Sequence, residues 1–166
     1  GDGSGTATVT ATAPVTAGST GNTVTVIFIA AGPMTDGGVS LDVPTGWSPP
    51  EGLTTVSSTG TTGNVTFSGQ TITVDGVNLS SNQTVTFTYA NATAQGSAGS
   101  AVFGVKSRGT ETGTLTTLES VSPDALTVAV SNAADGSGTM VANPATVVAN
   151  SAINVDFTYK AVGTMN

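Results

Sequence analysis

The first thirty-four residues of this chain recur, with substitutions, near its C-terminal end. Residues 1–34 run from D-G-S-G-T to A-A-G-P-M, and residues 134–165 follow the same order of motifs. The matched residues are Asp2 with Asp135, Pro14 with Pro144, Val24 with Val155, Val26 with Phe157, Phe28 with Tyr159, Gly32 with Gly163 and Met34 with Met165. A repeat this long indicates tandem domains rather than a solenoid of short repeats.

The repeat sets the domain organisation that we expect. One whole module should cover residues 1–131, and the first two strands of a second module should lie within residues 139–166. Residues 132–138 between them read N-A-A-D-G-S-G, a short linker whose turn chemistry favours a defined joint over a flexible tether.

Apolar and polar residues alternate with a period of two, and no stretch shows a convincing helical period. In residues 23–30 this pattern predicts that Val24, Val26 and Phe28 face the core. Pro14 interrupts the first strand, which is typical of an edge strand because proline cannot donate a ladder hydrogen bond. Other strands of the first module are expected at residues 6–12, 39–43, 53–57, 65–68, 71–79, 84–90, 101–106 and 126–131.

Many short strands separated by Gly-, Asn- and Ser-containing turns predict an all-β fold. We expect an Ig-like β-sandwich, with a closed barrel as the alternative. Residues 44–52 contain three prolines and two glycines, so they should form a rigid corner that carries Trp47, the single tryptophan.

The chain has few charges, and they are mostly acidic. Only 8% of its residues are charged, the net charge is −7, and the cations are Lys106, Arg108 and Lys160. Three cations cannot supply the row of phosphate contacts that nucleic-acid binding needs, and they argue equally against an anionic membrane as partner.

The sequence also contains neither cysteine nor a long apolar run. The longest apolar string, residues 26–31, has the length of a strand, so we expect no membrane insertion. Because the sequence starts at Gly1 rather than at methionine, we interpret it as a processed or excised piece of a secreted protein.

Three features carry a resemblance to a known family. They are D-G-S-G-T before a β-rich run at each module start, V-S-L-D-V-P-T-G-W-S at residues 39–48, and G-T-L-T-T-L-E-S at residues 113–120. In these features the chain resembles the tandem Ig-like repeats of large bacterial and archaeal surface proteins of adhesin or filament type. The resemblance implies an extracellular, non-enzymatic role at the cell surface and specifies no ligand.

Catalysis has few candidate groups in this sequence. Histidine and cysteine are absent, which removes the commonest general base and the usual nucleophile pairs. A carboxylate pair could still hydrolyse glycosides, but the ten acidic residues are scattered over loops. We therefore expect neither an enzyme nor an organic cofactor.

Two kinds of ligand have candidate residues. Asp2 and Asp135 recur at the module starts and could bind Ca²⁺, although a D-G-S-G turn stabilised by its own aspartate is the favoured interpretation. Trp47 could stack on a glycan from an exposed corner, although a lone tryptophan between prolines more often closes the end of a core.

Four asparagines stand in N-X-Ser/Thr sequons. Because serine and threonine are so common here, about three such sequons are expected by chance. N-glycosylation is therefore a weak prediction at Asn64, Asn78, Asn82 and Asn91.

The first two strands of the second module, residues 139–166, are the strongest functional candidate, and we call them the half-module. Its predicted strands, residues 140–148 and 153–160, cannot form an independently stable sheet in water. Each large apolar side chain left unburied forgoes about 1.5 to 3 kcal/mol of stabilisation. The expected assembly interface consists of Met140, Val147, Val155, Phe157, Tyr159 and Met165.

Three arrangements could cover these side chains. The half-module could belong to a longer tandem array, insert into a neighbouring copy by strand addition, or fold back on its own module. The first two predict a fibre built from copies of the chain joined head to tail. The alternative function is an adhesin-type binding or spacer module that recognises a glycan or another surface through its end loops.

Overall fold

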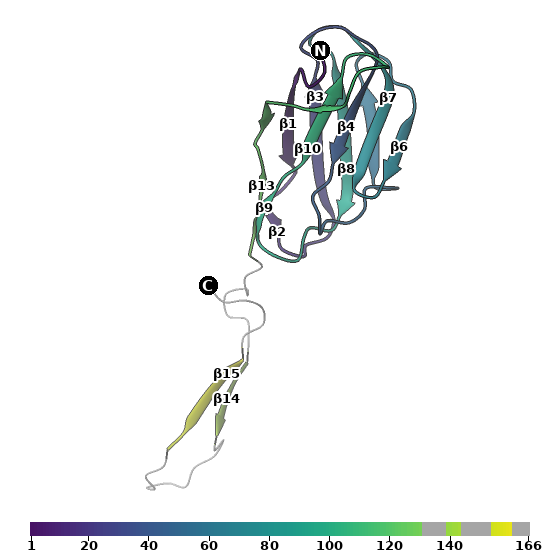
Figure 1. Ribbon diagram of the computed structural model, residues 1–166. Helices are drawn as coiled ribbons and strands as arrows, with labels where there is room; N and C mark the ends of the chain where they lie inside the picture. Colours follow the sequence, from purple (N-terminus) through teal and green to yellow (C-terminus); the bar gives the residue numbers. More distant parts are fainter. Residues whose placement is uncertain (131–138, 144–153, 161–166) are drawn as a thin grey trace. The chain divides into compact units, whose positions relative to one another are not determined.

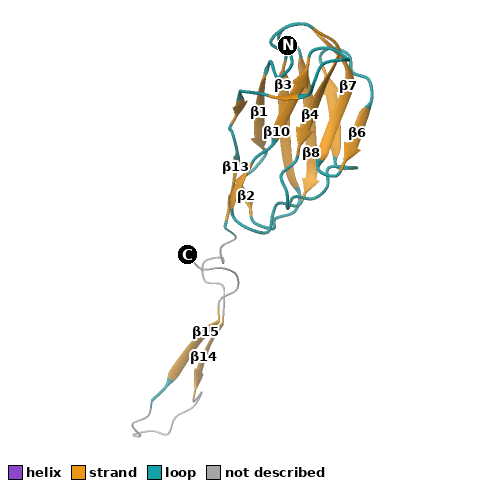
Figure 2. Ribbon diagram, in the orientation of Figure 1, coloured by secondary structure: helices purple, strands orange, loops and turns teal. Residues whose placement is uncertain are grey.

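A computed structural model describes residues 1–130, 139–143 and 154–160, and within these ranges all regular structure is strand. The chain divides into two compact units, Gly1–Ala129 and Val130–Asn166, each of which is described by itself. Figure 2 shows strands joined by loops in the described parts of the chain. The predicted all-β class is confirmed.

The first unit, Gly1–Ala129, is built on two five-stranded sheets that face each other (Figure 1). A smaller sheet at one end joins strands from both halves of the unit. In spatial order, the first sheet holds β12 (Val121–Ser122), β1 (Thr6–Ala11), β3 (Asn22–Ile29), β8 (Thr84–Ala92) and β5 (Thr54–Ser58). The second sheet holds β11 (Thr116–Thr117), β10 (Gly104–Arg108), β4 (Met34–Asp42), β7 (Thr71–Leu79) and β6 (Val65–Ser68). The small sheet holds β2 (Val15–Thr16), β13 (Leu126–Ala129) and β9 (Gly99–Ala101).

Strand alternation places one face of each large sheet in a common core. On β3, the side chains of Val24, Val26 and Phe28 are fully buried, as the period-two pattern predicts. The second sheet contributes Val39 and Leu41 from β4. Since burying each such side chain contributes about 1.5 to 3 kcal/mol, this shared core holds the sandwich together.

Two strands of the first unit are each interrupted and continue in a different sheet. The sequence pattern predicted only one of these two interruptions. At Pro14 the first strand leaves β3 and continues as β2, which pairs in parallel with β13. A second break separates β9, which pairs with β13, from β10, which pairs with β4. The single strand predicted at residues 101–106 is therefore wrong: Val102 is 59% exposed at the break, while Phe103 turns into the core.

The proline-rich corner is held by Trp47, whose side chain is only 4% exposed. Its indole meets the ring of Phe103 edge-on, with ring centroids 5.3 Å apart, and lies 6.2 Å from the ring of Tyr89. The side-chain amide of Gln70 donates to the carbonyl of Trp47 at 3.1 Å. The corner thus closes one end of the core.

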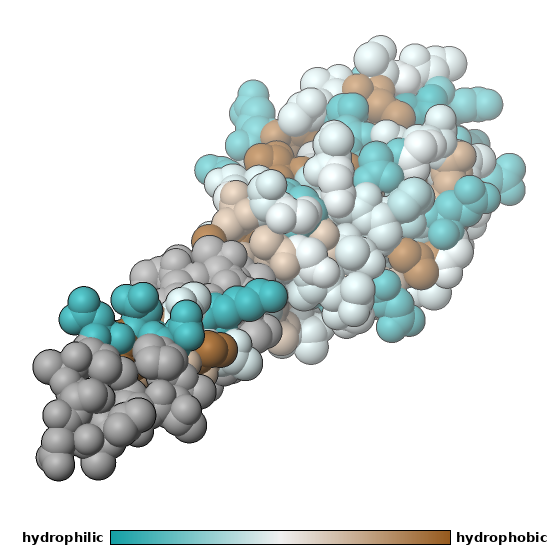
Figure 3. All heavy atoms as spheres, turned by 90° about the horizontal axis from the view of Figure 1, so that it is seen from below, coloured by the Kyte–Doolittle hydropathy of each residue, from teal (hydrophilic) through white to brown (hydrophobic). Residues whose placement is uncertain are grey.

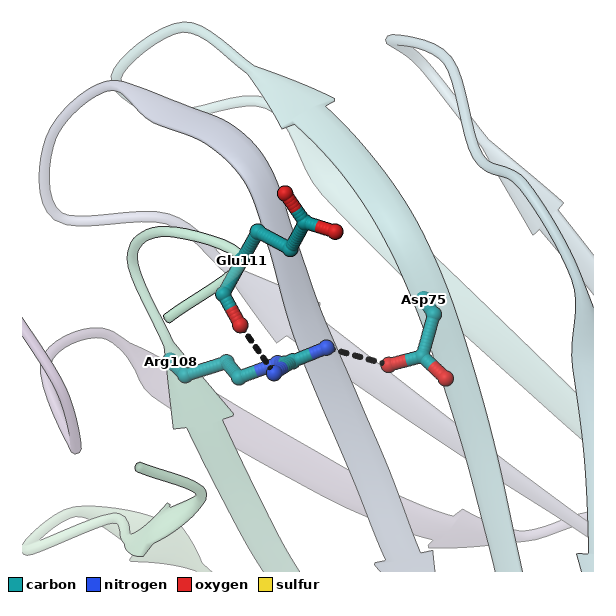
Figure 4. Close-up of polar contacts among 3 residues, drawn as sticks. All are labelled: Asp75, Arg108 and Glu111. Atoms are coloured by element: carbon teal, nitrogen blue, oxygen red, sulfur yellow. Dashed lines mark hydrogen bonds and ion pairs between the residues drawn. The ribbon is translucent and has the colours of Figure 1, made fainter. Parts of the chain in front are cut away.

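Arg108 reaches across the middle of the second sheet. It is paired with Gly38 on β4, and Gly38 is paired in turn with Asp75 on β7. The guanidinium passes over Gly38 to reach the Asp75 carboxylate at 2.7 Å, and it also donates to the carbonyl of Glu111 (Figure 4). A Cβ on Gly38 would lie 2.7 Å from Nε of Arg108, so any other residue here would force the arginine side chain to shift.

We predict that Gly38→Ala destabilises the first unit by about 1 to 3 kcal/mol, because the added methyl group overfills the space under Arg108. Chemical denaturation of the full chain measures this cost. In an Arg108→Ala background the same glycine substitution should cost clearly less, since the opposing atoms are gone. Equal costs in both backgrounds would contradict the steric explanation.

Candidate assembly interface

The second unit, Val130–Asn166, contains an antiparallel strand pair, β14 (Thr139–Asn143) and β15 (Asp156–Lys160). Met140 is opposite Tyr159, and Ala142 is opposite Phe157. Because side chains alternate across a strand, these four residues share one face, which we call the apolar face. The other face carries Thr139, Val141, Asn143, Asp156, Thr158 and Lys160.

The apolar face is largely exposed to solvent. Met140 is 68% exposed, Phe157 is 69% exposed and Tyr159 is 45% exposed, while Val155, just before β15, is half-buried. In Figure 3, brown apolar side chains are visible beside teal hydrophilic ones among the described residues of this unit. Met140 and Phe157 therefore forgo most of the stabilisation that full burial would provide.

The register of β14–β15 matches that of β1–β3 pair by pair. Thr6 is opposite Ile29 as Thr139 is opposite Lys160, and Ala7 is opposite Phe28 as Met140 is opposite Tyr159. The match continues with Val9 opposite Val26, as Ala142 is opposite Phe157. In the first unit, the residues equivalent to the apolar face are Ala7, Val9, Val26 and Phe28, and all of them are buried. The apolar face is thus the counterpart of a surface that lies in the core of the first unit.

A glycine before the first strand fits the same equivalence. Gly5 has a φ of +111°, and a Cβ at this position would lie 2.6 Å from the ring of Phe28. Glycine is therefore required where the chain passes this ring. The repeated sequence has Gly138 in the corresponding place, and Tyr159 corresponds to Phe28.

Besides its pairing with β1, β3 has a second neighbouring strand and a facing sheet that covers its buried side chains. β8 pairs with β3 from Asn22 to Ile29, and the second sheet covers the side chains that β3 buries. In the ranges that the structure describes, β14 is the only strand paired with β15. A complete sandwich would require further strands along β15.

Four of the six predicted interface residues lie in this region. Met140, Phe157 and Tyr159 are on the apolar face, and Val155 precedes it on the same strand face. Val147 and Met165 lie outside the described residues. Sequence reasoning missed Val141, which is 61% exposed on the opposite face. The sequence does contain an indication of this exposed valine, because Val141 is apolar at a position where the alternation in residues 139–143 otherwise places polar residues.

Asp2 caps a loop of the first unit. Its carboxylate accepts hydrogen bonds from the backbone N–H of Gly109 at 2.9 Å and of Thr114 at 2.7 Å. These two bonds, chiefly the one from Gly109, hold the pKa of the Asp2 carboxyl below its ordinary value of 3.8. Both hydrogen bonds of the Asp2 carboxylate thus come from a distant loop, so the favoured interpretation of a D-G-S-G turn stabilised by its own aspartate is wrong.

The structure supplies no partner carboxylates for calcium at this place. Within residues 1–130, 139–143 and 154–160 there is no group of three or more acidic or histidine side chains that could hold a metal ion. Asp135, the second candidate, lies outside the described residues. Calcium binding at the module starts remains a prediction.

The remaining candidates are placed as follows. Burial removes Trp47 as a glycan-stacking platform, because its indole packs into the end of the core. Asn64, Asn78, Asn82 and Asn91 are all exposed, so glycosylation remains a prediction at each. Asn82 and Asn91 adopt positive φ angles of 68° and 54°, a conformation that asparagine tolerates, and this explains both residues without a glycan.

A hollow beside Arg108 is a charged concavity of the first unit. It has a volume of about 320 Å³ and is lined by Asp36, Asp75, Gly76, Arg108 and Glu111. Its arginine is already bound to Asp75 and to the Glu111 carbonyl (Figure 4). The guanidinium of Arg108 is therefore already committed and is not available to an anion, and the described residues contain no group of three or more acidic side chains that could hold a metal ion.

Asp2→Asn should lower the melting temperature of the first unit at neutral pH, because the amide can accept only through one oxygen. The lowered pKa of Asp2 means that its contribution is complete above the unfolded-state pKa and is lost as the pH falls through the folded-state pKa. The difference from wild type should thus be largest above about pH 5 and should vanish in strong acid. Asp124→Asn, at an exposed aspartate, serves as the control in a calorimetric pH series. A difference that persists unchanged into strong acid would contradict this role.

Comparison with known proteins provides no family for this chain: no family model matches it, and no characterised protein matches it significantly. The described residues also contain no helix that is long and apolar enough to cross a membrane.

Proposed function

We propose that this chain is a structural subunit or repeat of an extracellular surface fibre, whose copies associate through the β14–β15 strand pair. The observation that carries this proposal is the apolar face, where Met140 and Phe157 are each about two-thirds exposed on a strand pair with the register of buried strands. Exposed apolar surface of this kind, presented on an incomplete sheet, favours association with further strands.

The composition supports close packing between copies of the chain. With 8% charged residues and an abundance of threonine and serine, the surface can approach other copies without desolvating many ions. The resemblance to tandem Ig-like surface repeats points the same way. An Ig-like topology of the first unit is part of this proposal, supported by two facing sheets and a first strand that switches between sheets at Pro14.

Head-to-tail insertion, the arrangement expected from the sequence, meets a constraint. It would place β14–β15 of one copy beside β8 of the next, where β1 and β3 already lie. Each copy has one position beside β8, and two of its strand pairs, β1–β3 and β14–β15, could occupy that position. Each inserted β14–β15 pair would therefore displace and expose one β1–β3 pair, unless strands of a second module are supplied.

The alternative function, recognition of a glycan through end loops, loses its main residue. Trp47 is buried against Phe103 and Tyr89, so its indole serves the core. A scaffold role is therefore the better supported of the two functions.

The proposal predicts that residues 1–166 associate and that residues 1–132 do not. Light scattering and sedimentation velocity over a concentration series measure association, and electron microscopy identifies fibres. The shorter chain keeps the whole first unit with its own core, so its loss of association would be specific to the second unit. A stable monomer of residues 1–166 at high concentration would overturn the proposal.

A single substitution isolates the apolar face. Phe157→Asp should abolish association, because a carboxylate on this face would be desolvated without a partner. Val102→Asp is the matched control, since Val102 is similarly exposed but lies in the first unit. Equal effects of both substitutions would show that added charge, rather than the apolar face, controls association.

A further inference from the structure

β15 matches two different strands of the first unit. By register it occupies the position of β3, with Val155, Phe157 and Tyr159 standing where β3 has Val24, Val26 and Phe28. By sequence it matches β8: residues 155–159 read V-D-F-T-Y, and residues 85–89 read V-T-F-T-Y. In β8 the three shared large residues, Val85, Phe87 and Tyr89, are fully buried.

β3 and β8 are direct neighbours in the first sheet. They pair antiparallel, with Val24 opposite Tyr89, Val26 opposite Phe87 and Phe28 opposite Val85. One strand that matches both members of this pair can therefore pair with a second copy of itself. Val155 would stand opposite Tyr159 of the other copy, Phe157 opposite the other Phe157, and Tyr159 opposite the other Val155.

We infer that β15 pairs antiparallel with β15 of a second copy, about a two-fold axis at Phe157. This inference rests on the proposed function and names the strand that extends the β14–β15 sheet. A two-fold contact uses the same surface on both partners, which β15 satisfies because its pattern V-x-F-x-Y reads as a complement to itself. Neither first unit has to give up a strand.

The resulting sheet would have the order β14, β15, β15, β14. In this register each residue of β15 stands opposite a residue whose side chain lies on the same face of the sheet. Met140, Ala142, Phe157 and Tyr159 of both copies would therefore form one continuous apolar surface. The backbone edge of β15 would gain ladder hydrogen bonds. Since such a contact joins two chains and then closes, growth into a fibre would require a second contact elsewhere.

Charges on the opposite face agree with this register. Within one strand pair, Asp156 faces Asn143 and Lys160 faces Thr139, so neither residue stands opposite a charged one. In the two-fold pairing, Lys160 would face Asn154 of the other copy and lie diagonally from its Asp156. Asp156 would also lie diagonally from Asp156 of the other copy, so the dimer would have two opposite-charge diagonals and one like-charge diagonal. Diagonal neighbours on antiparallel strands are about 7 to 8 Å apart, within reach of a lysine side chain.

A single cysteine tests the pairing in the full 166-residue chain, which has no cysteine of its own. Thr158 lies on the face opposite the apolar face, beside the proposed axis. The Thr158→Cys variant should form a covalent dimer with a short bismaleimide crosslinker. Thr55→Cys, at an exposed threonine on the edge strand β5, is the control and should not crosslink above background.

A second thiol separates the possible outcomes. Thr86 on β8 is opposite Ile27, the residue that Thr158 matches in the repeat. In a chain carrying both Thr86→Cys and Thr158→Cys, the thiols at positions 86 and 158 would therefore crosslink if β15 took the place of β3 in another copy. Mass mapping tells this link apart from the link between two positions 158. A link between positions 158 and 86 overturns the two-fold pairing but keeps the proposed function, whereas an uncrosslinked monomer overturns both.

Charge exchange provides a readout that general destabilisation cannot imitate. Asp156→Lys and Lys160→Asp should each weaken the dimer by about two- to fivefold, because each creates like charges across the diagonal. The double variant exchanges the two charges and should restore the dimer toward wild-type affinity in sedimentation equilibrium. A double variant no tighter than the single variants would overturn this register.

Discussion

The structure depends on the burial of one face of β3. Val24, Val26 and Phe28 lie between β1 and β8 in the first sheet and pack toward the second sheet, where they are fully buried. Because the chain has few charges and no cysteine, neither ion-pair networks nor disulfides share this task. The stability of the first unit therefore comes from apolar packing between two alternating sheets.

The same need to bury one apolar strand face applies to the second unit. β14 and β15 reproduce the register of β1 and β3, but the described residues include neither a β8 equivalent nor a facing sheet. A pattern that is stabilising inside the sandwich becomes an exposed apolar face on an isolated strand pair. The proposed function assigns the burial of this face to contacts with other copies of the chain.

Glycines and short polar side chains make the close approaches in the first unit possible. Gly5 lets the chain pass the ring of Phe28, and Gly38 lets Arg108 cross β4 to Asp75. Asp2 ties the start of the chain to the loop at residues 109–114. These contacts define how the loops close over the core, whereas the core itself is made by the strands.

The internal repeat predicted Met140 and Phe157 as interface residues, and both are largely exposed. Alternation in the sequence predicted most strands, including residues 65–68 and 71–79 with their observed bounds. These features are local, since a strand's two faces follow from neighbouring residues alone. The break at Val102 and the bonds of Asp2 to Gly109 and Thr114 were decided only by the tertiary structure. Each depends on residues far away in the chain, and no local period records which distant strand or loop will be the neighbour.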